Sequence, residues 1–143
     1  MNTGSTALRV LVLDDDPLWR RIIGHTLVKQ DAHVVNVGTV NDAVSAIDSA
    51  PFDLVLVDYE LPDGHGLDLF DRCDRDRMQR IVLVTGFADF PDLDDERANL
   101  VDGYLTKPFL SSDLIACLHG LVPRSSFCPL GTLIPAGHNS GAP

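Results

Sequence analysis

Cysteine is scarce in this sequence, and its pattern excludes two kinds of small-domain scaffold. The chain of 143 residues has three cysteines, Cys73, Cys117 and Cys128, and no two of them form a CxxC pair. An odd number of cysteines without metal-ligand spacing implies neither a disulfide framework nor a zinc site. We therefore expect the three cysteines to be packing or incidental residues. This use of cysteine is typical of a reducing compartment, so we predict that the protein lies in the cytoplasm.

Long apolar runs and an excess of positive charge are also missing. No run approaches the roughly 20 apolar residues that cross a membrane. Residues 1–7 contain neither the basic patch nor the apolar stretch of a secretory signal. Eleven Lys and Arg against 21 Asp and Glu leave a formal net charge of -10, which disfavours a basic face for nucleic acid or anionic lipid. We predict no direct nucleic-acid partner and no membrane partner.

The apolar residues that are present alternate between two periodicities. Short continuous apolar runs, typical of buried strands, are each followed by a segment with helical spacing. The predicted strands span residues 8–13, 32–37, 53–58, 81–84 and 103–106, and the predicted helices span about 17–27, 40–50, 67–75, 91–100 and 111–121. Strands that alternate with helices form a parallel sheet covered on both faces. The predicted fold class is therefore α/β, a doubly wound five-stranded parallel sheet with five helices.

The end of the chain differs in composition from its middle. From Pro123 onward the sequence is rich in Pro, Gly, Ser and small residues, as tails and linkers are. We divide the chain into a flexible leader (1–7), a folded domain (8–122) and a tail or linker (123–143). Residues 121–125 also resemble a thrombin cleavage site, so a natural linker and an expression scar both remain open.

Polar residues stand where four of the predicted strands end. Asp14 and Asp15 follow the first strand, Asp58 ends the third, Thr85 follows the fourth and Lys107 follows the fifth. The carboxyl ends of parallel strands line one edge of the sheet, where ligands bind in such folds. We therefore expect these side chains to converge. Carboxylates that converge raise one another's pKa unless a cation lies among them, and Mg²⁺, which accepts about six oxygen ligands, suits this set.

These residues can carry out phosphoryl transfer. Asp58 at a strand tip can act as a nucleophile that forms an acyl phosphate. Such transfer depends on positioning and on neutralising negative charge, so Mg²⁺ would act on one flank and the Lys107 ammonium on the other. The Thr85 hydroxyl would donate to a phosphoryl oxygen. The acidic triplet 14–16 alone could be a loop that caps a helix, which is the role we assign to Asp16.

Five motifs follow one another along the chain, each at the end of a predicted strand. They are VLDDDP, DLVLVD, LPxxxG, VTG and YLTKPF, at residues 12–17, 53–58, 61–66, 84–86 and 104–109. In this order they resemble the response-regulator receiver domains of two-component signalling, the CheY-like superfamily, over about residues 8–121. The resemblance implies the flavodoxin-like strand order 2-1-3-4-5 and a receiver domain at 8–122. It also implies a signalling domain rather than an enzyme, catalysing only its own phosphorylation and dephosphorylation.

The resemblance implies a partner and a metal site. Asp58 would accept a phosphoryl group from a phosphohistidine on a sensor histidine kinase or a phosphotransfer protein. Asp15 and Asp58 would bind Mg²⁺ directly, and Asp14 would act mainly through water. The backbone carbonyl of Glu60 would complete the protein ligands.

The resemblance also implies a conformational switch. Thr85 and Lys107 would hold the phosphoryl group, and the movement of Thr85 would leave space into which the Tyr104 ring turns. Tyr104 could equally be a plain buried aromatic in both states. The output face, and the face of any homodimer, would consist of the fourth helix, the fifth strand and the fifth helix. The Lys107-Pro108 peptide bond would be cis.

Two features depart from the family pattern. His65 stands where the family usually has an acidic residue ahead of the loop glycine. The predicted fourth helix, 91–100, has few apolar residues, so we expect it to be frayed or partly irregular, which would alter the output face.

Two other functions remain as alternatives. In a phosphatase of the haloacid-dehalogenase type, Asp14 would be the nucleophile and Asp16 the general acid. Against it, Leu18 stands where that family has Thr or Val, and no carboxylate pair follows Lys107. The other alternative is a receiver-like module that is not phosphorylated and serves only for dimerisation.

Overall fold

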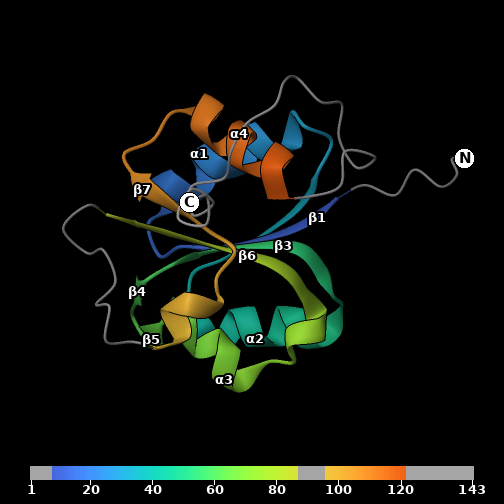
Figure 1. Cartoon of the computed structure of the whole chain (residues 1–143), viewed down its shortest axis with the longest axis vertical. Coiled ribbons are helices and arrows are strands. Elements are labelled where there is room, and N and C mark those ends of the chain that lie inside the picture. Colours follow the sequence, from blue (N-terminus) through green and yellow to red (C-terminus); the bar gives the residue numbers. More distant parts are fainter. Residues whose placement is uncertain (1–7, 87–95, 122–143) are drawn as a thin grey trace, which may run out of the picture.

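A computed structural model of the chain describes residues 8–86 and 96–121, drawn in colour in Figure 1. Its centre is a parallel sheet with the strand order β2-β1-β3-β6-β7. The strands are β1 (Arg9–Leu13), β2 (His33–Val37), β3 (Phe52–Asp58), β6 (Met78–Gly86) and β7 (Gly103–Lys107). They are the five predicted strands in the predicted order 2-1-3-4-5. The α/β fold class is therefore confirmed.

Helices cover both faces of the sheet (Figure 1). The helices α1 (Pro17–Val28) and α4 (Ser111–Leu121) lie on one face, and α2 (Val40–Ser49) and α3 (Leu69–Arg72) lie on the other. Successive residues of a strand point to opposite faces, so each strand contributes to two cores. Val12 and Leu56 pack with α1 and α4, whereas Leu13 and Val57 pack with α2. Burial on both faces explains why the strand sequences are continuously apolar.

The first two crossover helices begin as their sequences indicate. Asp16 Oδ1 accepts a hydrogen bond of 2.9 Å from the backbone N–H of Leu18, and Pro17 is the first residue of α1. In the same way Thr39 Oγ1 accepts from the N–H of Asp42 at 3.1 Å, at the start of α2. These caps satisfy backbone donors that have no partner within the helix. The assignment of Asp16 to helix capping is thus confirmed.

The prediction of five regular helices is wrong for the described part of the chain, where two of the five differ. The predicted helix 67–75 consists instead of a 3-10 turn (Gly66–Asp68), the four-residue α3, and a second 3-10 turn (Arg75–Arg77). After Phe70 the sequence has no apolar stripe with which a longer helix could pack against the sheet. In the predicted helix 91–100, residues 96–100 form the 3-10 helix η4 (Glu96–Leu100). Residues 91–95 lie outside the described residues.

Other boundaries follow from the same description. Strand β6 is longer at both ends than the predicted strand 81–84. Directly after β3, a segment predicted as a loop forms an antiparallel hairpin of β4 (Glu60–Leu61) and β5 (Gly64–His65). The predicted leader 1–7 and tail 123–143 lie outside the described residues. Within the described ranges, none of the helices has the length and apolar character needed to cross a bilayer.

Candidate functional site

The parallel register of the sheet brings the strand ends together. Asp14 directly follows β1, which lies beside β3. Asp58, the last residue of β3, pairs with Val84 in β6, and Lys107, the last residue of β7, pairs with Gly86. Residues more than 90 positions apart in the sequence therefore meet at one edge, because all five strands run in the same direction.

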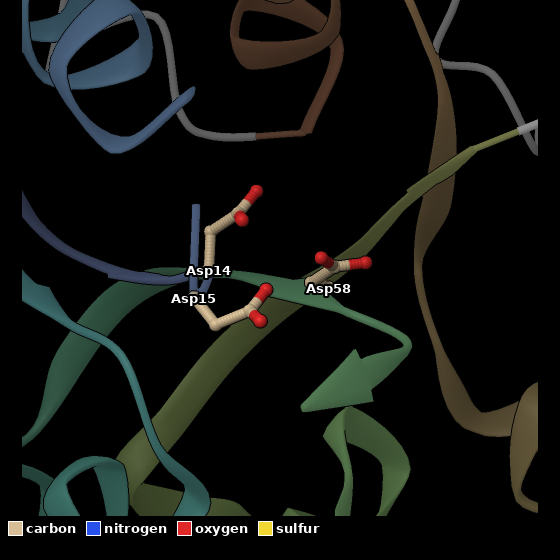
Figure 2. A group of neighbouring side chains, drawn as sticks. All are labelled: Asp14, Asp15 and Asp58. Carbon is tan, nitrogen blue, oxygen red and sulfur yellow. The ribbon is translucent and has the colours of Figure 1, made fainter. Parts of the chain in front are cut away.

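Three carboxylates form a cluster at this edge. Asp14, Asp15 and Asp58 each offer an oxygen atom, and these atoms all lie within 4.8 Å of one another. Figure 2 shows Asp14 and Asp15 directly after the end of β1 and Asp58 at the end of β3. Asp14 is almost fully buried, at 1% exposure, whereas Asp15 is exposed. The predicted convergence of these carboxylates is present.

The oxygen atoms of the cluster suit a hard divalent cation. An open pocket of about 400 Å³ adjoins the cluster and is lined by Asp15, Asp58, Glu60, Leu61 and Pro62. Mg²⁺ binds through one or two carboxylates and keeps several waters, and an open pocket with two carboxylates in its wall leaves room for both. The residues present therefore fit a magnesium ion.

Lys107 is the cation that the structure brings to this cluster. Its Nζ lies 2.7 Å from Asp14 Oδ2 and 3.4 Å from Asp58 Oδ2, and its side chain is 14% exposed. Burial by itself would lower the pKa of Lys107, but the bond to Asp14 and the charge of Asp58 outweigh burial and raise that pKa. The ammonium therefore stays charged beside the acidic residues. The predicted cis peptide bond between Lys107 and Pro108 is also confirmed.

Asp58 is the titratable group with the most perturbed pKa at this edge. Burial is the largest cause, and the charge of Asp14 adds to it, while Lys107 acts in the opposite direction. The net result raises the pKa of Asp58 from 3.8 to about 6. Burial disfavours the ionised form of Asp58, and a nearby cation would stabilise that form.

The loop after Asp58 is shaped by one glycine. A side chain on Gly66 would meet the backbone carbonyl oxygen of Asp58 and would come within 3.1 Å of Val57 Cβ. The Gly66 N–H instead donates a 2.8 Å hydrogen bond to the carbonyl of Tyr59. The last residue of the LPxxxG motif is therefore a glycine because the chain returns against the backbone of β3 at this point.

Asp63 holds the hairpin against α2, a role that the sequence did not reveal. Its two carboxylate oxygens accept the backbone N–H groups of Val40 and Asn41 at 2.8 and 3.0 Å. These hydrogen bonds lower the pKa of the Asp63 carboxyl. Capping residues are normally sought just before a helix. Asp63 lies 23 residues after Val40, the first residue of α2, so no local pattern could have indicated this cap.

His65 and Glu60 lie in the same hairpin. The His65 ring stacks on Tyr59 with centroids 4.7 Å apart, and its backbone N–H donates to Asp68 Oδ2 at 2.9 Å. The His65 side chain, which departs from the family pattern, is therefore packed against Tyr59. Glu60 is exposed and lines the pocket beside Asp58.

Thr85 and Tyr104 occupy different parts of the sheet edge. Thr85 is 1% exposed and lies near the end of β6, one position beyond the residue paired with Asp58. Tyr104 lies in β7, where it pairs with Leu83 of β6, and its hydroxyl donates a 2.8 Å hydrogen bond to the carbonyl of Ala98 in η4. Burial raises the pKa of the Tyr104 phenol.

The fold and the cluster together define a doubly wound α/β domain with an acidic edge and a half-buried lysine beside it. A family model for the response regulator receiver domain matches residues 10–119. Transcriptional regulatory protein TcrA of Mycobacterium tuberculosis is 32% identical over 123 residues, or 83% of this chain and 47% of that protein. A CheY-like receiver domain from Methylobacillus flagellatus is 25% identical with a TM-score of 0.71, over 81% of this chain and 99% of that one. The beryllofluoride-activated receiver domain of DrrB is 26% identical with a TM-score of 0.65, over 79% and 95% of the two chains.

The chain belongs to the response-regulator receiver family, as its motifs predicted. Members of this family are signalling domains of two-component systems rather than classical enzymes. The chain spans about half the length of the curated relatives it matches, which are transcriptional regulators.

Proposed function

We propose that the chain accepts a phosphoryl group on Asp58 from a sensor histidine kinase or a phosphotransfer protein, in a reaction that requires Mg²⁺. The observation that supports this most is the position of the Lys107 ammonium, 2.7 Å from Asp14 and 3.4 Å from Asp58. The acceptor carboxylate thus has a positive charge close by, and Asp14 and Asp15 lie beside it as further oxygen ligands for a cation. Phosphoryl transfer needs neutralisation of the phosphoryl charge, which Lys107 and a bound Mg²⁺ would supply together.

In this proposal each residue has a defined task. A carboxylate oxygen of Asp58 forms a bond to phosphorus as the P–N bond of the phosphohistidine breaks, and the leaving imidazole keeps the electron pair and takes up a proton. Lys107 and the Thr85 hydroxyl bind the phosphoryl oxygens. Mg²⁺, held by Asp15 and Asp58, by Asp14 through water and by the Glu60 carbonyl, supplies neutralisation of the phosphoryl charge when bound.

Asp58 is suited to the nucleophilic role by its pKa. The value of about 6 lies below neutral pH, so the carboxylate is ionised when it must attack. It also lies well above 3.8, the ordinary value, and a carboxylate of raised pKa is a better nucleophile than an ordinary one at equal ionisation. Burial and the charge of Asp14 raise this pKa, and Lys107 limits the rise.

The proposed output follows from the contact of Tyr104. Movement of Thr85 toward the phosphoryl group would allow the Tyr104 ring to turn, and turning would break the hydrogen bond from its hydroxyl to Ala98. The 3-10 helix η4 would then adopt a different position at the edge strand β7, which has η4 on one face and α4 on the other. This surface is the proposed contact face for a partner or for a second copy of the chain.

The longer relatives suggest where the signal goes. Because the curated relatives are transcriptional regulators about twice as long as the matched region, we propose that the chain controls a DNA-binding region in a protein of that kind. The prediction that these residues themselves bind neither DNA nor a membrane stays a prediction, as does the cytoplasmic location.

Labelling with acetyl phosphate tests the proposed acceptor. We expect the chain to gain the mass of one phosphoryl group in the presence of Mg²⁺, to lose this gain with EDTA, and to lose it in Asp58→Asn. Asp53→Asn is the matched control, because it makes the same change near the opposite end of β3, where Asp53 accepts the backbone N–H of Arg9 at 2.8 Å. Label in Asp58→Asn at wild-type level would contradict the proposal.

The same experiment separates the alternatives. Asp14 is buried and its Oδ2 is 2.7 Å from Lys107, while Asp16 caps α1. This arrangement disfavours Asp14 as nucleophile and Asp16 as general acid of a phosphatase. A transient adduct on Asp14 with turnover would support the phosphatase. A dimer that forms without label, and that beryllofluoride leaves unchanged in both the wild type and Asp58→Asn, would support the dimerisation module.

A further inference from the structure

Trp19 lies at the site without being one of its polar residues. It is the only tryptophan of the chain and is the third residue of α1. The Lys107 Nζ atom lies over its ring, 5.3 Å from the centroid. Trp19 also packs against Phe109, with ring centroids 4.9 Å apart. The indole is therefore held in place by a residue that follows Lys107 by two positions.

The contacts of the Lys107 ammonium leave one side for the ring. Asp14 lies 2.7 Å and Asp58 3.4 Å from Nζ, so the ammonium is bound more closely to the residue that is not the proposed acceptor. A lysine side chain has a flexible four-carbon stem, and two carboxylates alone permit it to move between them and solvent. An aromatic face attracts a cation without offering it a hydrogen bond. The ring thus adds a third favourable contact to the ammonium, besides those with Asp14 and Asp58.

We propose that Trp19 is a positioning residue for phosphoryl transfer, because its indole ring holds the Lys107 ammonium beside Asp58. This inference rests on the proposed function, in which Lys107 binds the phosphoryl group. Trp19 itself touches neither the carboxylates of the cluster nor the phosphoryl group in this proposal. Trp19 acts on the reaction only by holding Lys107. A general packing role would not act specifically on Lys107, which separates the two roles.

The first test measures the exposure of Lys107 without any phosphoryl transfer. The chain contains two lysines, Lys107 and Lys29, and Lys29 is exposed at the end of α1. Limited acetylation followed by mass spectrometry gives the labelling ratio of Lys107 to Lys29 within each molecule. We expect Trp19→Leu to raise this ratio roughly fivefold, the factor that corresponds to about 1 kcal/mol of cation–π attraction. We expect Trp19→Phe, which keeps an aromatic face, to stay within about twofold of the wild type.

The second test measures the reaction. At saturating Mg²⁺, the rate of labelling by acetyl phosphate should fall roughly fivefold in Trp19→Leu and should be mostly retained in Trp19→Phe. The affinity for Mg²⁺ should change by less than about twofold in either variant, since both leave the three carboxylates in place. Leu18→Ala is the control, because Leu18 is the exposed neighbour of Trp19, at 59% exposure, and it should alter neither quantity.

The outcomes distinguish this inference from the proposed function. An unchanged Lys107 to Lys29 ratio in Trp19→Leu overturns the role of Trp19, whatever the wild type does with acetyl phosphate. An equal loss in Trp19→Phe and Trp19→Leu also overturns it, because packing rather than the aromatic face would then be responsible. A wild type that takes up no phosphoryl group contradicts the proposed function, while the labelling ratio still decides whether the ring holds Lys107.

Discussion

The acidic edge of the sheet and the η4 segment are held by different kinds of interaction. Asp58 is the last residue of β3. The two residues before it, Leu56 and Val57, are buried in opposite cores. The η4 segment buries Ala98 in the core, and it also makes polar contacts that involve two arginines, Arg97 within η4 and Arg75. We call these contacts the arginine clamp: Arg97 with Asp68 and Asp71, and Arg75 with Asp102 and the carbonyl of Leu100.

The difference lies in how much free energy each kind of contact contributes. A buried aliphatic side chain contributes about 1.5–3 kcal/mol through burial alone, whereas a half-exposed ion pair contributes roughly 0.2–1 kcal/mol. The ion pairs of Arg97 are 2.7 Å long, but Asp71 is largely exposed to water. We therefore expect the strand that carries the proposed chemistry to be held more strongly than the ion pairs hold η4, so that η4 is displaced at lower cost. Such a division suits a switch.

Shortening a core residue beneath the site should produce the largest effect. Leu56 is 1% exposed and lies in β3 two residues before Asp58. We expect Leu56→Ala to lower the free energy of unfolding by about 2–5 kcal/mol, because it removes buried surface and leaves a cavity. Urea denaturation followed by circular dichroism measures this. Leu100→Ala in η4, where the side chain is 50% exposed, should stay within about 0.5 kcal/mol. Equal losses would contradict the proposed difference between the regions.

The pH dependence of stability should show an intermediate effect that belongs to the acidic edge alone. The pKa of Asp58 is raised from 3.8 to about 6 in the folded chain, chiefly by burial. Between these values the folded chain binds more protons than the unfolded chain, so stability falls as pH rises through that window. Allowing for screening by solvent, we expect a loss of about 1–2 kcal/mol.

The variant Asp58→Asn isolates this contribution. It should be more stable than the wild type near neutral pH and nearly equal to it below pH 3.8, where Asp58 is protonated in both states. The measurement is the difference in free energy of unfolding between the two proteins across this range, in the absence of divalent cations. Addition of Mg²⁺ near neutral pH should stabilise the wild type more than the variant. A difference that does not change with pH would contradict the raised pKa.

Breaking the arginine clamp should produce the smallest effect on stability. Arg97→Ala removes both ion pairs to Asp68 and Asp71, and we expect a loss of at most about 1 kcal/mol. The loss should shrink in about 1 M salt, where exposed charges are screened. Arg72→Ala, at an exposed position of α3, is the matched control. A loss comparable to that of Leu56→Ala would mean that η4 is as rigid as the site.

Much of the site could be predicted from the sequence because its residues stand at strand ends. Asp14, Asp58, Thr85 and Lys107 each follow a recognisable apolar run, and parallel strands must present these ends at one edge. The cap at Asp16 was predictable for a similar reason, since capping acts over two or three residues. Local pattern and tertiary position agree for all of these residues.

Other features were not predictable, because their partners are distant in sequence. Asp63 caps a helix that begins 23 residues earlier, and Arg97 reaches an aspartate 29 residues away. The helix predicted over 67–75 failed because its continuation lacks an apolar face, a weakness that propensity alone does not reveal. The contact between Trp19 and Lys107 spans 88 positions, and the sequence offered for Trp19 only an assignment to packing or to a partner surface.

The sequence alone determined the alternation of strands and helices and the acidic, hydroxyl and amine groups at the strand ends, because periodicity and strand-end motifs act locally. Its motifs also indicated the family, and the strand order followed from that resemblance. Only the tertiary structure decided which carboxylate Lys107 approaches most closely, how strongly burial shifts the pKa of Asp58, and what holds η4 in place. These depend on distances and on exclusion of water, and both arise only once the sheet has packed between its two layers of helices.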